Sequence, residues 1–154
     1  LFPYTTLFRS TNTVGIVDRV MREHTLAGMD SFQCADFASD QALSNIVMEE
    51  PDVIVHCAGT SLVGPSMTNP GEYYDNNIAK TIKLLNVVKD LPKKPLIMFS
   101  SSASVYGVPE SCPICEDAAV RPISPYGNTK AMTETILKDY ARAYCVESIC
   151  LLPL

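Results

Sequence analysis

Residues 96–107 have the sequence LIMFSSSASVYG, in which four apolar residues precede a run of hydroxyl side chains. A short, continuously apolar run is typical of a strand buried on both faces of a parallel sheet. The serines would then stand at the carboxyl end of that strand, where open α/β sheets bind their ligands. This stretch therefore predicts a strand followed directly by ligand-binding hydroxyl groups.

Similar apolar runs occur on both sides of this stretch, and they alternate with segments of helical period. The other predicted strands cover residues 31–35, 53–57 and 148–152. The predicted helices cover residues 40–50, 71–90 and 124–144, with a further short amphipathic helix within residues 13–29. Strands that alternate with helices indicate the α/β class, and we expect a doubly wound, Rossmann-type parallel sheet.

Composition excludes several classes of protein. The chain has 154 residues, of which 47% are hydrophobic and 19% charged, as in ordinary globular proteins. The net charge is −5 and the basic residues are not clustered, so we expect no nucleic-acid partner. No apolar run is long enough to cross a bilayer and no signal-peptide pattern opens the chain. We expect a cytoplasmic protein whose partner is a small molecule.

The six cysteines do not form a recognisable metal-binding or disulfide framework. Cys112 and Cys115 have CxxC spacing, but no second pair accompanies them. Neither His24 nor His56 has ligand spacing to that pair, so we expect no metal and a loop with two reduced thiols. The other four, which follow apolar patterns, are expected to be buried: Cys34, Cys57, Cys145 and Cys150.

The sequence SPYGNTK at residues 124–130 contains the strongest catalytic signal. Ser124 is a plausible N-cap and Pro125 suits the first helical position, so a helix should begin here. Tyr126 and Lys130 are four residues apart and would share one face of that helix. An ammonium group at that distance stabilises a phenolate, which can then accept a proton from an alcohol. Tyr126 is therefore a candidate catalytic base.

Four motifs together carry a resemblance to a known family: VIVHCAG, NPGEYYDNN, FSSSASVYG and SPYGNTK. In this order they resemble the extended short-chain dehydrogenase/reductases of the NAD-dependent epimerase/dehydratase family, from about residue 31 to the end. Within that family the chain is most similar to the nucleotide-sugar 4-epimerases. The small residues after the strand at 53–57 are consistent with a backbone that approaches a flat or charged ligand closely.

The resemblance assigns roles to individual residues. It implies that Tyr126, Lys130 and Ser102 are catalytic, and that Ser102 and Tyr126 contact the sugar. The implied cofactor contacts, besides Tyr126 and Lys130, are Asp36, Phe37, Cys57, Ala58, Gly59, Thr60 and Asn76. The chain departs from the family at Ser61, where a lysine is usual, which puts one cofactor contact in doubt. We interpret His56 as a hydrogen-bonded strand residue rather than a catalytic one, because no carboxylate is placed to orient it.

The implied activity is NAD-dependent epimerisation at C4 of a nucleotide sugar of the UDP-glucose/UDP-galactose type. The family also implies a homodimer formed through the helices near 71–90 and 124–144. Three alternatives stay open. A 4,6-dehydratase usually has Asp-Glu where this chain has Ala103 and Ser104, and an NADP-linked reductase would share the same architecture. The third is a non-catalytic dinucleotide sensor whose redox-active groups are Cys112 and Cys115.

The two ends of the sequence suggest that part of the family's domain is absent. Residues 1–10, LFPYTTLFRS, match the translation of a sequencing adapter, and we expect them to be an artefact. Residues 11–154 then form a partial NAD-binding domain that lacks strands 1 and 2, the Gly-rich loop and the substrate domain. We expect the chain alone to be inactive, marginally stable and prone to aggregation.

Overall fold

The computed structural model describes residue 13 and residues 15–19 and 30–152. The expected adapter-derived segment, residues 1–10, lies outside the described residues. The strands are β1 (Gly15–Asp18), β2 (Ser31–Cys34), β3 (Val53–His56), β4 (Leu96–Ser100) and β5 (Ser148–Leu151). The α-helices are α1 (Asp40–Glu49), α2 (Val63–Ser66), α3 (Pro70–Tyr74), α4 (Lys80–Val88) and α5 (Pro125–Tyr144). A π-helical turn (Asp75–Ala79) joins α3 to α4, and a 3-10 helix (Ala103–Tyr106) follows β4.

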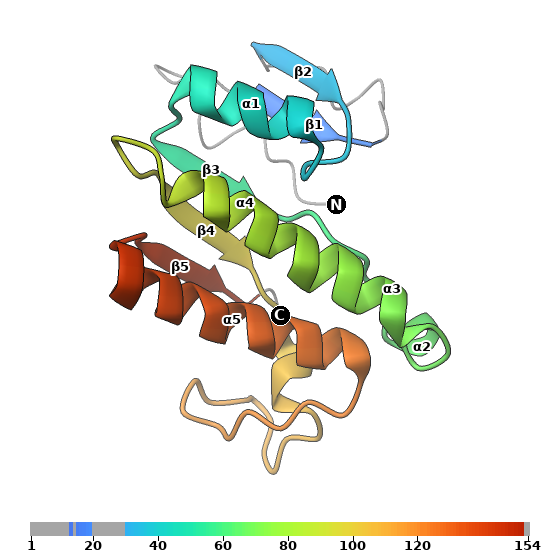
Figure 1. Ribbon diagram of the computed structural model, residues 1–154. Coiled ribbons are helices and arrows are strands. Elements are labelled where there is room, and N and C mark those ends of the chain that lie inside the picture. The colour runs from blue at the N-terminus through green and yellow to red at the C-terminus, as the bar shows by residue number, and fades with distance from the viewer. Residues whose placement is uncertain (1–12, 14, 20–29, 153–154) are drawn as a thin grey trace.

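All paired strands run parallel, which confirms the predicted fold class. β1 pairs with β2, and β3, β4 and β5 form a second sheet in that order. Helices α1, α4 and α5 lie on the same side of the strands (Figure 1). The carboxyl ends of β3 and β4 therefore meet at one edge, where the polar residues predicted to bind a ligand follow them.

Strand β1 occupies the start of the range 13–29, in which a short helix was predicted, so no helix forms at residues 15–18. Residues 14 and 20–29 of that range lie outside the described residues. Ile16 and Val17 are β-branched and lie opposite Phe32 and Gln33 of β2. The apolar run of Ile16 and Val17 is too short to show either the helical or the strand period. In the doubly wound order 3-2-1-4-5-6, the neighbour of the third strand is the second. β1 therefore occupies the place of the second strand, which we had expected to be absent.

The hydrophobic core lies between the three-stranded sheet and helices α4 and α5. Its most deeply buried members include Leu85, Val88, Ile97, Leu137 and Val146, none more than 1% exposed. Alternate residues of a strand point to opposite faces, and the other face of this sheet is open. It carries the exposed side chains of Val53, Val55, Ile149 and Leu151. The expectation that the strands are buried on both faces is wrong for β3 and β5, because none of the described helices covers that side (Figure 1).

Candidate active site

Helix α5 begins as the sequence predicts and presents Tyr126 and Lys130 on one face. The Ser124 hydroxyl accepts a hydrogen bond of 3.1 Å from the backbone N–H of Gly127, and Pro125 occupies the first turn. The ammonium nitrogen of Lys130 lies 5.8 Å from the centre of the Tyr126 ring. A cation at that distance interacts with the aromatic ring, so the two side chains are neighbours as predicted.

The Lys130 side chain is fixed against the end of strand β4. Its ammonium group donates a hydrogen bond of 2.8 Å to the carbonyl oxygen of Ser100 and lies 4.7 Å from the centre of the Phe99 ring. Only 6% of the residue is exposed. This burial lowers the pKa of Lys130, although the nearby Cys57 has a smaller effect in the opposite direction. Lys130 therefore enters the site as an ordered group that is shielded from water.

Ser102 stands beside the first turn of α5. It caps the 3-10 helix, and its hydroxyl accepts a hydrogen bond of 3.2 Å from the backbone N–H of Ser104. The two segments approach so closely that a Cβ atom at Gly127 would lie 2.6 Å from the carbonyl oxygen of Ser104. The structure thus brings Tyr126, Lys130 and Ser102 to one end of β4, while their catalytic roles stay predictions.

A second link between α5 and the serine run was not predicted. Ser101 is 2% exposed, and its hydroxyl donates a hydrogen bond to the carboxylate of Glu134. Its backbone N–H donates to the carbonyl oxygen of Leu151 at 2.8 Å. Glu134 lies four residues after Lys130, and this spacing was the only signal in the sequence. Glu134 positions the serine run, because it ties Ser101 to the helix that carries Tyr126 and Lys130.

The turn after β3 is held by an asparagine that the sequence analysis overlooked. Asn77 accepts a hydrogen bond of 2.7 Å from the backbone N–H of Thr60 and donates one of 3.0 Å to its carbonyl oxygen. It also donates to the Thr129 hydroxyl of α5 at 3.0 Å. Gly59 has φ of 151°, and a Cβ atom there would lie 2.7 Å from the Asn77 side-chain oxygen. Only glycine suits both the conformation and the contact.

The other predicted cofactor residues gather at the ends of β2 and β3. Asn76 is 9% exposed and donates a hydrogen bond of 2.9 Å to the Thr60 hydroxyl, so it does not face solvent. Asp36 follows β2 and accepts from the backbone N–H of Ala38 at 3.0 Å, and the neighbouring Phe37 ring lies 5.0 Å from that of His56. Cys57 and Ala58 continue directly from β3 into the turn.

These residues fit a dinucleotide chemically. Asp36 offers an acceptor suited to an adenine amino group, while the small residues Ala58 and Gly59 leave the backbone accessible. Lys130 and Ser102 offer donors at the next strand end. Ser61, which replaces the family's usual lysine, has an exposed side chain, and its carbonyl oxygen accepts a hydrogen bond of 3.0 Å from Tyr73.

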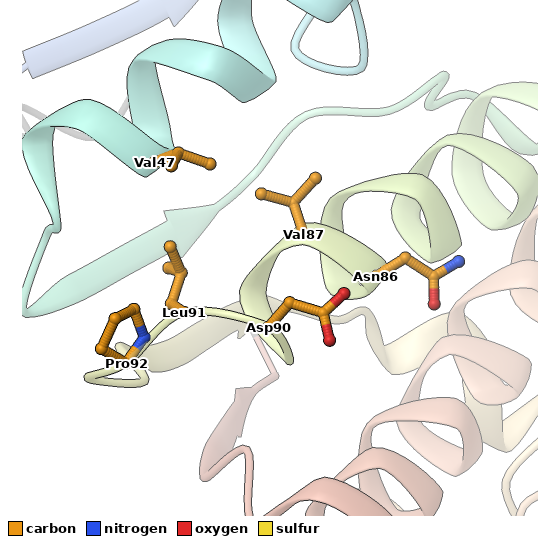
Figure 2. Close-up of a pocket in the computed structure, with 6 residues that line it drawn as sticks. All are labelled: Val47, Asn86, Val87, Asp90, Leu91 and Pro92. Atoms are coloured by element: carbon orange, nitrogen blue, oxygen red, sulfur yellow. The ribbon is translucent and has the colours of Figure 1, made fainter.

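A shallow pocket among the described residues lies away from this site. It is lined by Val47 of α1 and by the end of α4 with the residues that follow it, Asn86, Val87, Asp90, Leu91 and Pro92 (Figure 2). These last residues precede the amino end of β4, whereas the candidate active site lies at its carboxyl end. The pocket therefore belongs to neither the predicted catalytic nor the predicted cofactor residues.

The cysteines differ in part from the expectation. Cys112 and Cys115 are exposed thiols, and no disulfide joins any of the six cysteines, all of which are described. No cluster of metal-binding side chains was found in the described part of the chain. The prediction that the other four are buried was wrong, since only one of them is even half-buried: Cys34, Cys57 and Cys145 are exposed and Cys150 is intermediate. Apolar neighbours in the sequence are not sufficient to bury a thiol, because burial depends on tertiary packing.

His56 is a buried, hydrogen-bonded strand residue, in agreement with its interpretation from the sequence. It is 4% exposed, and its Nε2 atom lies 2.9 Å from the Thr81 hydroxyl. The rings of Phe37 and Phe99 pack beside it. Burial, and to a smaller degree the charge of Lys130, lowers the pKa of His56 from 6.5 to about 4.

We expect this histidine to make the fold sensitive to acid. Between about pH 6.5 and pH 4 the unfolded chain binds the proton and the folded chain does not, so the free energy of unfolding falls as the pH is lowered. The loss over that window is about 3 kcal/mol. Urea unfolding followed by circular dichroism at pH 7 and pH 4 measures it. His56→Gln, which cannot titrate, should lose clearly less stability, and an equal loss in both proteins would contradict the assignment.

Comparison with known proteins is consistent with this geometry. A family model described as GDP-mannose 4,6 dehydratase matches residues 4–152, almost the entire chain. The chain belongs to this family of NAD-dependent epimerases and dehydratases. The membership explains why the short motifs at residues 53–59, 99–107 and 124–130 occur together in this order.

The family members similar to this chain include several UDP-glucose 4-epimerases. The enzyme of Streptococcus mutans is 42% identical over 140 residues, which cover 88% of this chain and 42% of that enzyme. The enzyme of Bacillus subtilis is 39% identical, over 85% of this chain and 39% of its own length. This chain thus spans about two-fifths of the length of the curated relatives it matches.

Solved structures of the epimerase/dehydratase family have the same fold. UDP-glucose 4-epimerase from Brucella ovis in complex with NAD superimposes with a TM-score of 0.83 at 33% identity, over 91% of this chain and 43% of that one. The UDP-Glc/GlcNAc 4-epimerase from Campylobacter jejuni gives a TM-score of 0.79 at 28% identity, over 90% of this chain and 44% of that one.

Within the described residues, no helix has the length and apolar composition needed to cross a bilayer.

Proposed function

We propose that the enzyme to which this chain belongs interconverts nucleotide sugars that differ at C4, with NAD as its bound cofactor and UDP-glucose and UDP-galactose as its substrates. The single observation that carries the proposal is the grouping of Tyr126, Lys130 and Ser102 at the carboxyl end of β4. Similarity to UDP-glucose 4-epimerases supports the choice of substrate.

In the proposed mechanism the chain's own residues move the proton and hold the reactants. Tyr126 takes the proton from the sugar 4-hydroxyl and later returns it. The Lys130 ammonium, 5.8 Å from the tyrosine ring, stabilises the phenolate, and Ser102 donates or relays a hydrogen bond at the same hydroxyl. The chemistry that NAD supplies when bound is acceptance and return of the C4 hydride. The close contact between α5 and the segment after β4 keeps Tyr126, Lys130 and Ser102 in a fixed arrangement.

A 4,6-dehydratase is the second candidate, because the matching family model is described by that activity. Elimination of water needs an acid and a base next to the sugar in addition to the tyrosine. At the positions where dehydratases usually carry them, this chain has Ala103 and Ser104, which begin the 3-10 helix. Neither side chain can serve, so epimerisation is favoured. No feature of the site favours an NADP-linked reductase or a sensor based on the exposed Cys112 and Cys115.

We further propose that the enzyme is a homodimer assembled through α4 and α5. The Tyr140 hydroxyl of α5 donates a hydrogen bond of 2.8 Å to the side-chain oxygen of Asn86 on α4. The Lys89 ammonium lies 5.5 Å from the centre of the Tyr144 ring. These contacts fix the two helices as one surface that a second copy can cover. The inactivity of the chain alone, the foreign origin of residues 1–10 and the cytoplasmic location stay predictions.

The proposal is tested in a completed enzyme, in which this chain replaces the segment of the Streptococcus mutans UDP-glucose 4-epimerase with which it aligns. We expect the purified protein to retain NAD and to convert UDP-galactose into UDP-glucose, measured by coupling the product to UDP-glucose dehydrogenase. A completed enzyme that folds and retains NAD but releases a 4-keto-6-deoxy sugar would establish the dehydratase instead. Absence of both activities from a folded, NAD-loaded protein would refute the assignment.

A further inference from the structure

Lys80 stands at the centre of a chain of hydrogen bonds that crosses the predicted cofactor site. Its ammonium group donates to the Asp36 carboxylate at 2.6 Å and to the side-chain oxygen of Asn76 at 2.7 Å. The amide nitrogen of Asn76 in turn donates to the Thr60 hydroxyl at 2.9 Å. The resemblance to the family assigns the other three residues to the cofactor, but it assigns nothing to Lys80.

This chain of bonds joins two strand ends that are far apart in the sequence. Asp36 follows β2 and Thr60 follows β3, while Lys80 is the first residue of α4. The side chains of Lys80 and Asp36 are 23% and 29% exposed, so the ion pair is partly shielded from water but not fully buried. A buried or half-buried charge pair with good hydrogen bonds holds its geometry better than a solvated pair does.

Both oxygens of the Asp36 carboxylate are engaged. One accepts from the backbone N–H of Ala38 at 3.0 Å and the other accepts from Lys80. Burial on its own would raise the pKa of Asp36, but the hydrogen bonds from Lys80 and Ala38 outweigh burial and the pKa is lowered. The group therefore remains an ionised acceptor in a fixed orientation. An acceptor of this kind suits the 6-amino group of adenine, which can only donate.

We propose that Lys80 is a positioning residue for the adenosine end of the cofactor. It orients the Asp36 carboxylate toward the adenine amino group, and through Asn76 it connects that carboxylate to the turn at Thr60. The inference rests on the proposed function, because Asp36 can contact an adenine only if the cofactor is an adenine dinucleotide. The ligand class is an adenine nucleotide, and the recognised feature is the 6-amino donor.

The test compares ADP with inosine diphosphate, which carries a carbonyl oxygen in place of the 6-amino group. Affinities are measured by calorimetry on the completed enzyme after removal of NAD. The enzyme with Lys80 should bind ADP more tightly than inosine diphosphate. Lys80→Met should weaken ADP binding about 3- to 10-fold, because the Asp36 acceptor of the adenine hydrogen bond is no longer pre-organised. The affinity for inosine diphosphate should be nearly unchanged. Lys80→Arg should restore part of the preference.

Lys83→Met is the matched control, because Lys83 is an exposed lysine of the same helix and its loss changes the net charge equally. It should leave both affinities unchanged. Equal ADP affinity in the Lys80→Met and Lys83→Met proteins would overturn the inference, as would an equal loss for both nucleotides, which would indicate a general charge effect. If the unaltered enzyme binds neither ADP nor NAD, the proposed cofactor itself fails, and the role of Lys80 fails with it.

Discussion

Tyr126→Phe is expected to lower the kcat of the completed enzyme by about 10²- to 10⁴-fold, the usual contribution of a positioned acid–base group. The substitution removes only the phenolic oxygen, so the ring can keep its edge-to-face contact with Tyr73, whose centre is 6.4 Å away. Because the Lys130 ammonium is held by the Ser100 carbonyl oxygen independently of Tyr126, NAD should stay bound. Initial rates of UDP-galactose conversion and the absorbance of bound cofactor measure the two effects separately.

Tyr74→Phe is the matched control for this prediction. Tyr74 is an exposed tyrosine of α3, and the same single oxygen is removed. Its kcat should stay within about twofold of the unaltered enzyme, as for most surface substitutions. A Tyr126→Phe enzyme that keeps full activity would show that another group takes the proton, and the proposed mechanism would have to be abandoned.

Gly127→Ala is expected to impair both folding and catalysis. The added Cβ atom would lie 2.6 Å from the carbonyl oxygen of Ser104, a backbone atom that cannot rotate away as a flexible side chain can. It would also lie 3.1 Å from the Cβ of Pro122, which belongs to a rigid ring. Overpacking of this kind costs about 1–3 kcal/mol. Relief of the clash moves the first turn of α5 away from the 3-10 helix and so separates Tyr126 from Ser102. A displacement of about 1 Å can lower the rate by about 10²-fold.

The control is Gly71→Ala in α3, where an added Cβ atom meets nothing within 4 Å. Alanine is also the better helix former, so this protein should be as stable as the parent or slightly more so. Urea unfolding gives the stability difference, and kcat gives the effect on geometry. If both alanine variants behave alike, the close approach at Gly127 does not hold the site together.

The strands and helices with a clear period were predictable, whereas the first strand was not. Residues 96–99 are continuously apolar, residues 53–57 are apolar apart from His56, and both segments form strands. The start of helix α5 at Pro125 was predictable, because its capping residue Ser124 and the proline itself are local signals. β1 has only Ile16 and Val17 to mark it, and its pairing with β2 depends on residues sixteen positions away in the register Ile16 to Phe32. Local patterns do not contain that information.

The candidate site was predictable where a family motif supplied it. Tyr126 and Lys130 are neighbours on one helix, and Ser102 follows the strand end that holds Lys130, while the roles assigned to the three residues stay predictions. Residues whose contribution depends on a tertiary contact were missed. Asn77 becomes informative only when the turn after β3 packs against it, and Glu134 only when α5 lies along the serine run. Lys80 was missed for the same reason, since Asp36 is 44 residues away in the sequence.

The wide turn at residues 75–79 constrains how this segment can evolve. It lets Asn76 and Asn77 face the loop after β3 while Leu85 and Val88, further along, face the sheet. Deleting one residue would convert it into an ordinary α-helical turn and rotate one flank by about 100° relative to the other. Either the side chains of Asn76 and Asn77 would turn away from the loop, or Leu85 and Val88 would leave the core. Homologous sequences should therefore tolerate substitutions here far better than changes in length.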